Sequence, residues 1–273
     1  MKKILMAFML AFTVPVTLLG GASALAQTNV QQLALEAADG ERITGFIYQN
    51  IKTEKDAPLA ILMHGMTGSS LGWLADNHGA FTDLITKELI GKGYRVVALD
   101  ARSHGVRKDN MKPLERLKNL RSGKPEPYLA MIEGTLNDYD ILLAKVNKNF
   151  GPPKHILAAG YSMGAQMAVL FAAKHKEVTH IVTMVPPAAQ SAKIVAPLTH
   201  AGKVQAKWLL ITANQDQFAS PADNDALEQA GGGKLTRVEF DSKHRLPRGY
   251  LDGVGDWIAP LEPCAQPPLV HTW

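Results

Sequence analysis

The stretch AAGYSMGAQMAVLFAA, residues 158–173, has a serine between two glycines at the point where an apolar run changes to a helical pattern. We expect a strand before Ser162 and a helix after it, so that the serine lies on the turn between them. A strained turn of the form G-x-S-x-G exposes the serine hydroxyl, and side chains at Gly160 and Gly164 would crowd it. The stretch therefore predicts a nucleophile. A glycine-rich packing turn is the alternative.

The same alternation of strand and helix extends along most of the chain. The continuous apolar run APLAILMHG, residues 57–65, is typical of a strand buried on both faces of a sheet. Strands that take turns with helices form a mostly parallel sheet with helices on both faces. We therefore predict an α/β fold with a mostly parallel, doubly wound sheet of about eight strands. A hairpin around Asp39-Gly40 would supply an antiparallel N-terminal edge. The expected strands are 33–35, 43–48, 57–65, 94–99, 155–159, 179–185, 208–213 and 235–240, and the expected helices are 81–89, 128–150, 163–174 and 250–258.

Two segments interrupt this alternation. Residues 105–127 carry seven basic and three acidic side chains and would form a flap. Within them Met111 is in helical phase with the leucines at 114, 117 and 120. The positive charge of this segment suits either an anionic substrate or a solvated surface loop. Residues 186–206 have room for one helix and a turn, which predicts a small cap. We expect one domain over residues 27–273, with an irregular tail from about residue 260.

The first 26 residues have the pattern of a signal peptide. Two lysines precede an apolar run, and residues 24–26 form a small-x-small cleavage site before Gln27. An uncleaved membrane anchor is the alternative, but Pro15 and the small residues at the end of the run favour cleavage. We therefore expect a secreted or periplasmic protein with no stable membrane anchor after cleavage.

Composition excludes several classes of function. Without Lys2 and Lys3 the chain keeps 27 basic side chains against 25 acidic ones, which does not indicate nucleic-acid binding. Cys264 is the only cysteine, so no internal disulfide can form. The histidines show no metal-binding spacing, and no glycine-rich nucleotide motif is present. We expect no metal and no cofactor.

Reactive side chains follow several of the expected strands. Ligands of parallel sheets gather beyond the carboxyl ends of the strands, where Ser162, Asp216 and His244 would meet. A serine hydroxyl needs an imidazole to take its proton, and the imidazole needs a carboxylate to fix its tautomer. The chain order serine, aspartate, histidine is the order that a nucleophile elbow of this kind requires. We predict these three residues as a catalytic triad.

Competing candidates fit the pattern less well. Of nine histidines only His244 and His271 follow Asp216, and His271 lies in the irregular tail. Asp241 is three residues before His244 and is interpreted as a turn former. Asp100 also ends a strand but precedes the serine in the chain, so we interpret it as a residue that ties down a loop.

An oxyanion hole would complete the site. The turn His64-Gly65-Met66 leaves the Met66 amide free, and the Met163 amide behind the serine would be the second donor. His64 is either a base or a structural histidine, and the structural role is favoured. We expect Met66, Met163, Trp73 and Met111 to line an acyl pocket, with ordinary core packing as the alternative.

The motifs HGMTGS, LDARSHG, GYSMG, ITANQDQFASP and SKH occur in this order along the chain. From about residue 40 to 258 the chain resembles the α/β-hydrolase superfamily, in particular its serine carboxylesterases and acyl hydrolases. It departs from the family where Ala213-Asn214 replaces the glycine that is common before the acid-bearing turn. The resemblance implies the α/β-hydrolase fold, with Ser162 as nucleophile, His244 as base, Asp216 as the residue that orients it, and the amides of Met66 and Met163 as oxyanion hole.

We interpret the chain as a serine hydrolase that cleaves carboxylic esters through an acyl-enzyme on Ser162. The small cap favours small-molecule esters with short to medium acyl chains over triglyceride droplets. One alternative is a small-peptide or amide hydrolase, because the triad chemistry is the same. Another is a catalytically silent binding protein of the same fold, against which the intact triad counts. The sequence carries no prediction of the oligomeric state.

Overall fold

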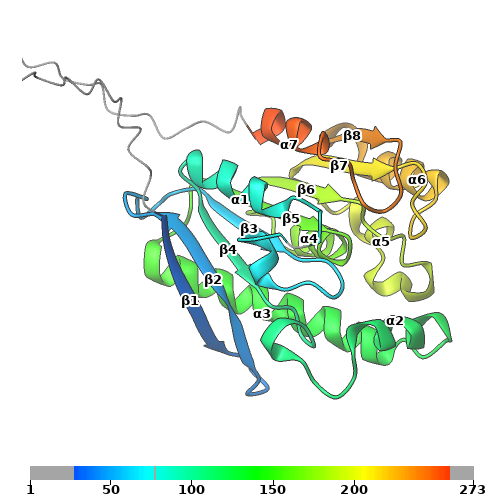
Figure 1. Ribbon diagram of the computed structural model, residues 1–273, viewed down its shortest axis with the longest axis horizontal. Coiled ribbons are helices and arrows are strands. Elements are labelled where there is room, and N and C mark those ends of the chain that lie inside the picture. The colour runs from blue at the N-terminus through cyan, green and yellow to red at the C-terminus, as the bar shows by residue number, and fades with distance from the viewer. Residues whose placement is uncertain (1–27, 77, 259–273) are drawn as a thin grey trace, which may run out of the picture.

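The computed structural model describes residues 28–76 and 78–258, and within them eight strands form a single sheet (Figure 1). The strands are β1 (Thr28–Glu36), β2 (Arg42–Asn50), β3 (Leu59–Met63), β4 (Arg95–Leu99), β5 (Ile156–Tyr161), β6 (His180–Met184), β7 (Lys207–Ala213) and β8 (Leu235–Phe240). Their order across the sheet is β1-β2-β4-β3-β5-β6-β7-β8. β2 runs antiparallel to both of its neighbours, whereas β3 to β8 are parallel. The predicted α/β fold with an antiparallel N-terminal edge is confirmed.

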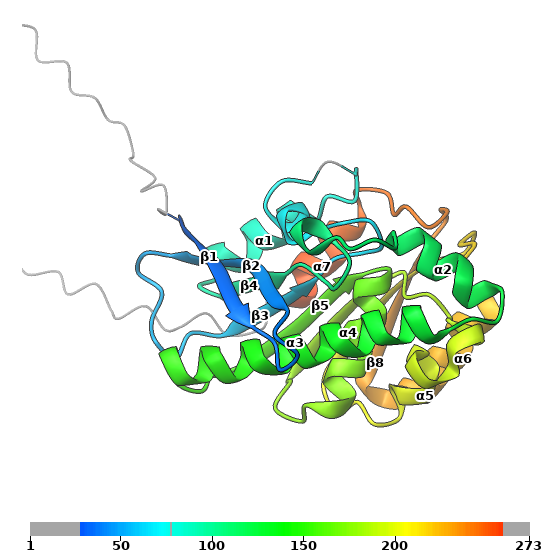
Figure 2. The same ribbon diagram turned by 90° about the horizontal axis from the view of Figure 1, so that it is seen from below.

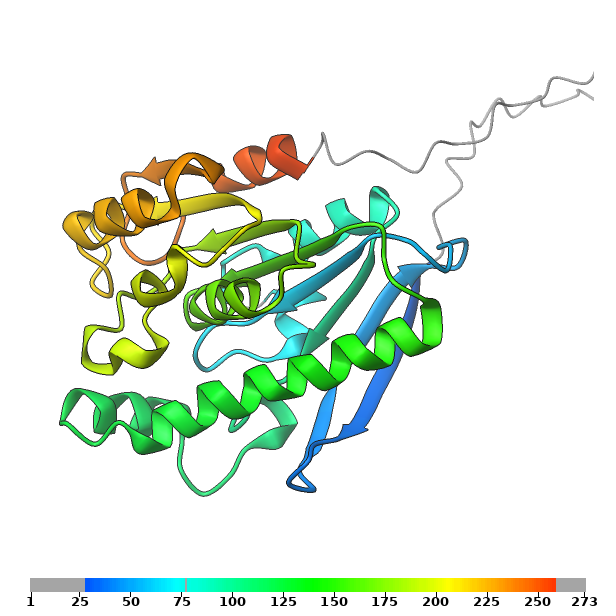
Figure 3. The ribbon, with the colours of Figure 1, turned by 180° about the vertical axis from the view of Figure 1, so that it is seen from behind.

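Helices cover both faces of the sheet. They are α1 (Thr82–Gly91), α2 (Pro113–Arg121), α3 (Glu126–Phe150), α4 (Met163–Lys174), α5 (Pro197–Ala201), α6 (Pro221–Gly231) and α7 (Tyr250–Ile258), with short 3₁₀ helices η1 (Ser70–Trp73), η2 (Gly105–Arg107), η3 (Gln190–Val195) and η4 (Gly232–Lys234). α1 and α7 lie on one face, and the long α3 crosses the other face beside α4 (Figures 2 and 3). None of the described helices has the length and hydropathy needed to span a bilayer.

Each face of the sheet contributes to a separate hydrophobic core. On β3, Leu59, Ile61 and Met63 pack on the side of α3 and α4. Ala60 and Leu62 point the other way, toward α1 and α7. Successive side chains of a strand point to opposite faces, so a strand covered on both sides must be apolar throughout. This explains the unbroken apolar run at residues 57–65.

The structure adds one helix to those predicted. α6 follows β7 and begins with a capping box, in which the Ser220 hydroxyl accepts from the Asp223 amide and the Asp223 carboxylate accepts from the Ser220 amide. Pro221 occupies the first helical position, which suits its fixed φ angle. The motif S-P-x-D therefore indicates the start of α6, which hydrophobic periodicity alone does not predict.

The two interrupting segments are short helical caps rather than separate domains. The first contains η2 and α2, and Leu120 of α2 joins the core on the α3 side of the sheet. The second contains η3 and α5, and Ala201 of α5 joins the same core. Both segments therefore rest on the side of the sheet that α3 and α4 cover.

A buried cluster of charges joins the N-terminal hairpin to the rest of the fold. Asp138, in the middle of α3, has a fully buried carboxylate that accepts from Arg107 at 2.7 Å and from Arg102 at 3.0 Å. Arg107 also pairs with Glu41 at 2.8 Å, and Arg102 pairs with Asp39. The cluster thus links the β1–β2 turn, the loop after β4 and α3.

Candidate active site

The predicted site residues lie at one edge of the sheet. Because β3 to β8 are parallel, the loops after β3, β5, β7 and β8 all begin at the same edge. These loops contain the 64–68 motif, Ser162, Asp216 and His244. Cys264 and His271, like the expected signal peptide at residues 1–26, lie outside the described residues.

Ser162 lies on a strained turn between β5 and α4. Its backbone has φ 56° and ψ −118°, a conformation that residues with a side chain rarely adopt. A Cβ atom at Gly160 would lie 2.2 Å from the carbonyl carbon of Gly164. One at Gly164 would lie 1.9 Å from the carbonyl oxygen of Met63. Only glycine fits at both positions, which explains the two glycines around the serine.

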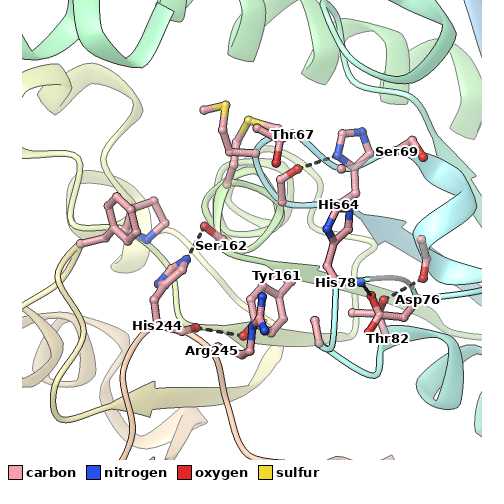
Figure 4. Close-up of a pocket in the computed structure, with 18 of the residues that line it drawn as sticks. His64, Thr67, Ser69, Asp76, His78, Thr82, Tyr161, Ser162, His244 and Arg245 are labelled. Carbon is pink, nitrogen blue, oxygen red and sulfur yellow. Dashed lines mark hydrogen bonds between the residues drawn. The ribbon is translucent and has the colours of Figure 1, made fainter. Parts of the chain in front are cut away.

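The structure brings the three predicted triad side chains into one hydrogen-bonded chain, of which Figure 4 shows the bond between Ser162 and His244. The Ser162 hydroxyl lies 2.8 Å from Nε2 of His244, and Nδ1 of His244 lies 2.8 Å from a carboxylate oxygen of Asp216. The Asp216 carboxylate is buried, and its other oxygen accepts the amide of Phe218 at 2.8 Å. A carboxylate at Nδ1 favours the tautomer whose Nε2 can accept the serine proton.

A tyrosine inside the elbow holds the loop that carries the histidine. The Tyr161 hydroxyl donates to the carbonyl of His244 at 2.9 Å and accepts from the amide of Leu246 at 3.1 Å. Burial raises the pKa of Tyr161 to about 12, so the phenol keeps the proton that it donates. The edge of Phe218 also packs on the His244 ring, with 4.5 Å between ring centroids. The imidazole is therefore held from two sides.

The two predicted oxyanion donors flank the serine. Met163 is the first residue of α4, and Met66 follows Gly65 in the loop after β3. A Cβ atom at Gly65 would lie 3.2 Å from the carbonyl oxygen of Tyr161, so this loop approaches the elbow closely. Neither amide donates a hydrogen bond within the part of the chain that the structure describes. Both remain available to a ligand.

His64 is a structural histidine, as predicted. Its Nδ1 donates to the carbonyl of Gly65 at 2.8 Å, and its Nε2 accepts from the amide of Ala101 at 3.0 Å. Burial lowers the pKa of His64, which favours this neutral form. The imidazole thereby joins the loop after β3 to the loop after β4.

Asp100 ties down loops, as predicted. Its buried carboxylate accepts from both the amide and the hydroxyl of Ser70 at 2.8 Å, and from Thr44 and the amide of Val106 at 3.2 Å. Asp241 is exposed and accepts from Gln215 at 2.7 Å. Neither aspartate replaces Asp216 at the histidine.

A cavity of about 400 Å³ opens beside the serine. Met66, Trp73 and Met163 line it, as predicted, together with Leu114 and Leu117 of α2. The prediction for Met111 is wrong: this residue precedes α2 and does not line the cavity, and its sulfur instead accepts from Asn119 at 3.7 Å. Apolar walls of this size accommodate a small organic group.

The positive charge of residues 105–127 is partly neutralised within the fold. Arg107 is buried in the Asp138 cluster, and Arg116 pairs with Asp109 at 2.5 Å. Arg121 lies over the face of Phe218, 5.6 Å from the ring centroid. The segment is thus mainly a structural wall of the site, which fits the surface-loop interpretation of its charge.

Tyr161, Phe218 and Arg245 also line the cavity, although no sequence pattern singles them out. Each lies within two residues of a triad member, and this adjacency is the signal that could have found them. Arg245 is exposed and is drawn among the residues that line the cavity in Figure 4. Among the described residues, no group of three metal-ligating side chains could hold a metal ion.

Comparison with known proteins identifies the family. A model of the alpha/beta hydrolase family matches residues 60–273. The fold is similar to that of a cold-adapted esterase from an Arctic intertidal metagenomic library (18% identity, 86% of this chain and 94% of that chain, TM-score 0.67). It is also similar to an esterase of Pyrococcus furiosus (16% identity, 85% of this chain and 92% of that chain, TM-score 0.63). A third similar structure is an acetyl xylan esterase from a Paenibacillus species (14% identity, 87% of this chain and 85% of that chain, TM-score 0.68). A search of curated proteins found no match. The chain belongs to the alpha/beta hydrolase family.

Proposed function

We propose that this protein is a serine hydrolase that cleaves carboxylic esters through an acyl-enzyme on Ser162. The observation that carries the proposal is the hydrogen-bonded chain from Ser162 through His244 to Asp216, at the wall of an apolar cavity. The similarity of the fold to several esterases supports an ester as the substrate. No metal or cofactor is needed for this chemistry.

In the first step the Ser162 oxygen attacks the acyl carbon while its proton passes to Nε2 of His244. The carbonyl electrons move to the oxygen, where the amides of Met66 and Met163 would donate hydrogen bonds. The N-terminus of α4 adds a favourable field for this negative charge. The tetrahedral intermediate then collapses, and the alcohol leaves with the proton from His244.

In the second step water attacks the acyl-enzyme and gives a proton to His244. The second tetrahedral intermediate releases the carboxylic acid, and the proton returns to Ser162. Asp216 stays ionised throughout and stabilises the imidazolium that forms twice in the cycle. The apolar cavity of about 400 Å³ supports acyl groups of short to medium length.

A fluorophosphonate probe tests the proposal directly, because it reacts with an activated serine and needs no knowledge of the substrate. We expect labelling of the wild-type protein and none of Ser162→Ala. Ser122→Ala changes an exposed serine at the end of α2 and should label like the wild type. A folded wild-type protein that does not label would point to a binding protein without catalysis.

Ester and amide hydrolysis are separated by a substrate panel. We expect hydrolysis of p-nitrophenyl acetate and of esters with somewhat longer acyl chains, and little hydrolysis of aminoacyl anilides. Faster hydrolysis of the anilides than of the esters would contradict the proposed esterase and would support a small-peptide or amide hydrolase. The same panel gives the acyl length at which the rate falls.

We also propose export from the cytoplasm with removal of residues 1–26. The lysines, the apolar run and the small residues before Gln27 support this proposal. Mass spectrometry of the protein from the periplasm or culture medium should give a mature N-terminus at Gln27. A membrane-bound product that keeps Met1 would contradict it.

A further inference from the structure

We propose that a second cavity beside the catalytic one binds the distal part of the substrate, and that this part is an apolar arm carrying a hydrogen-bonding group such as a hydroxyl, a carbonyl or a second ester. The inference rests on the proposed ester hydrolysis at Ser162. It assigns to the substrate a polar group remote from the bond that is cleaved.

The second cavity, here called the distal cavity, has a volume of about 380 Å³ and lies between the 186–206 segment and α6. Its walls are largely apolar: Pro186, Pro197 and Leu198 come from the segment, and Leu227 comes from α6. Pro186, Pro197 and Leu227 are buried and Leu198 is exposed, so most of this wall belongs to the packed fold. An apolar arm is the ligand that such walls accommodate.

One polar side chain in this cavity lacks a partner. Asn224, on the first turn of α6, is only 3% exposed and lines the distal cavity. Its backbone amide donates to the carbonyl of Ser220, but its side-chain amide makes no hydrogen bond to any residue that the structure describes. The residue is buried, but its amide atoms are not among the fully enclosed polar atoms of the described residues, so they can be reached from the cavity. An amide that faces a cavity without a protein partner can take its hydrogen bonds from water or from a ligand there. Its donor and acceptor suit a hydroxyl or carbonyl rather than pure hydrocarbon.

The distal cavity adjoins the catalytic cavity at Pro187, which lines both. A third cavity of about 360 Å³ lies alongside, and it shares Phe218 with the catalytic cavity and Ala219 with the distal one. β5 and β7 are separated by one strand, so their ends lie roughly 10 Å apart. In this proposal an arm of medium length passes Pro187 on its way from an ester at Ser162 toward Asn224.

A side-chain bridge holds the two walls of this passage together. Gln190, in η3, donates to the Asp223 carboxylate at 2.7 Å, and both residues line the distal cavity and the third cavity. Asp223 is itself fixed by the hydroxyl and amide of Ser220. The passage is therefore formed before the substrate arrives, which lowers the cost of ordering the arm.

The test compares two esters that differ in one group. The p-nitrophenyl esters of ω-hydroxydecanoate and of undecanoate have arms of similar size, one ending in a hydroxyl and the other in a methyl. We expect Asn224→Leu to shift the ratio of their kcat/KM values by about tenfold toward the methyl arm, the size of one hydrogen bond. Hydrolysis of p-nitrophenyl acetate, which does not reach the distal cavity, should not change.

Two further variants complete the kinetic test. Gln229→Leu makes the same change of an amide to leucine on an exposed part of α6, and it should keep the wild-type ratio. Leu198→Trp fills the distal cavity from its half-exposed wall and should slow both long esters while sparing the acetate. A wild-type ratio in Asn224→Leu, or equal effects of Leu198→Trp on long and short esters, would overturn the inference.

A binding measurement separates this inference from the proposed function. Ser162→Ala is titrated calorimetrically with ω-hydroxydecanoate and with undecanoate, with and without Asn224→Leu. We expect Asn224→Leu to weaken binding of the hydroxy acid about tenfold and to leave the other acid unaffected. If the protein hydrolyses no ester, the proposed function fails while this titration still decides the distal site. If acetate is hydrolysed but Asn224→Leu shifts neither ratio nor affinity, the distal site alone fails.

Discussion

The hydroxyl of Tyr161 has one partner on each side, the carbonyl of His244 and the amide of Leu246. Tyr161 is the last residue of β5 and immediately precedes Ser162, so its side chain connects this strand to the loop that contains His244. Its hydroxyl bonds to backbone groups of the histidine loop and not to the Ser162 hydroxyl or the ring nitrogens of His244, so we assign it a positioning role. Its effect on the rate would pass through the placement of the imidazole.

For Tyr161→Phe we expect kcat on p-nitrophenyl acetate to fall by about tenfold, because two hydrogen bonds to the histidine loop are lost while the ring still packs. KM should change little, since the cavity keeps its shape. Thermal unfolding of the variant measures its stability, so that an effect on stability can be told apart from an effect on kcat. An unchanged kcat in a destabilised protein would mean that Tyr161 supports only the fold.

Substitutions of the three triad residues should reduce activity to different extents. His244→Ala removes the only base within reach of the Ser162 hydroxyl among the described residues, and kcat should fall by a factor of about 10³ or more. Asp216→Asn keeps the shape of the side chain and should lose less activity than Ser162→Ala, because the carboxylate orients and stabilises but does not react. Steady-state kinetics on a p-nitrophenyl ester measure both. More than a tenth of the activity in His244→Ala would show that the base is misassigned.

Much of the site could be predicted from single residues because its chemistry demands particular types in a particular chain order. Ser162, Asp216 and His244 each follow a strand, and parallel strands bring their ends together. Asn224 could not be found in this way, because a buried asparagine is recognisable only when its lack of partners is seen. The contact between Tyr161 and the loop at residues 244–246 is likewise tertiary, and no spacing in the sequence encodes it.

Among the secondary-structure elements, the junction of β5 and α4 has the least tolerance for change. A Cβ atom at Gly164 would lie 1.9 Å from the backbone oxygen of Met63, the last residue of β3. Backbone atoms cannot give way as the end of a flexible side chain can. The start of α4 is therefore pressed directly against the neighbouring strand.

For Gly164→Ala we expect a loss of about 3 kcal/mol of unfolding free energy, because the new methyl group overpacks a rigid contact. Gly253→Ala is the matched control: it lies inside α7, its Cβ would meet nothing within 4 Å, and it should stabilise the protein by about 0.5 to 1 kcal/mol. Urea denaturation followed by circular dichroism measures both. Equal stability of the two variants would contradict the steric argument.

The predictions for α4 and α7 have the observed bounds. α7 has an apolar stripe at helical spacing, whereas α4 is buried on all sides from Met163 to Ala172 and is recognisable by its apolar run after the G-x-S-x-G turn. Helical periodicity missed α6, whose buried residues Asn224 and Leu227 are few and whose start is marked by capping chemistry instead. It placed Met111 in helical phase with the leucines of α2, although the helix begins at Pro113. A periodic pattern does not by itself say where a helix starts.

At the scale of the whole molecule, the Asp138 cluster connects parts that are far apart in the chain. Asp138→Asn would leave the buried guanidinium of Arg107 and the mostly buried one of Arg102 with less compensating charge. We expect a loss of about 3 to 5 kcal/mol of unfolding free energy. Asp83→Asn, in the i,i+4 pair with the exposed Lys87, should cost less than about 0.5 kcal/mol. A small loss in both variants would show that the cluster contributes little to stability.

Stability should also fall with acid. Burial, and then the neighbouring His64, lower the pKa of His104 to about 4, whereas an unfolded histidine titrates near 6.5. Between these values the unfolded chain binds the extra proton, so the unfolding free energy rises with pH and decreases on acidification. From pH 7 to pH 5 this histidine alone should remove about 2 kcal/mol. In His104→Gln the slope of stability against pH over this range should be smaller, and an equal slope would contradict the assignment.

The sheet as a whole was predictable in class but not in strand order. Alternating strands and helices require a mostly parallel sheet, and the turn at Asp39-Gly40 requires a hairpin. Nothing in the periodicity states that β4 lies between β2 and β3, because lateral order depends on the direction of each crossover. The same limit hid the adjacent cavities, whose shared walls come mainly from the 186–206 segment and the loop after β7.

The segments 105–127 and 186–206 supply much of the walls around the substrate yet contain no member of the triad. Each segment connects two strands or helices of the fold, so its length and side chains can vary without moving Ser162, Asp216 or His244. Selection, natural or in the laboratory, can therefore retune what this protein recognises by exchanging these two inserts. The inherited catalytic apparatus would remain intact while new specificities evolve around it.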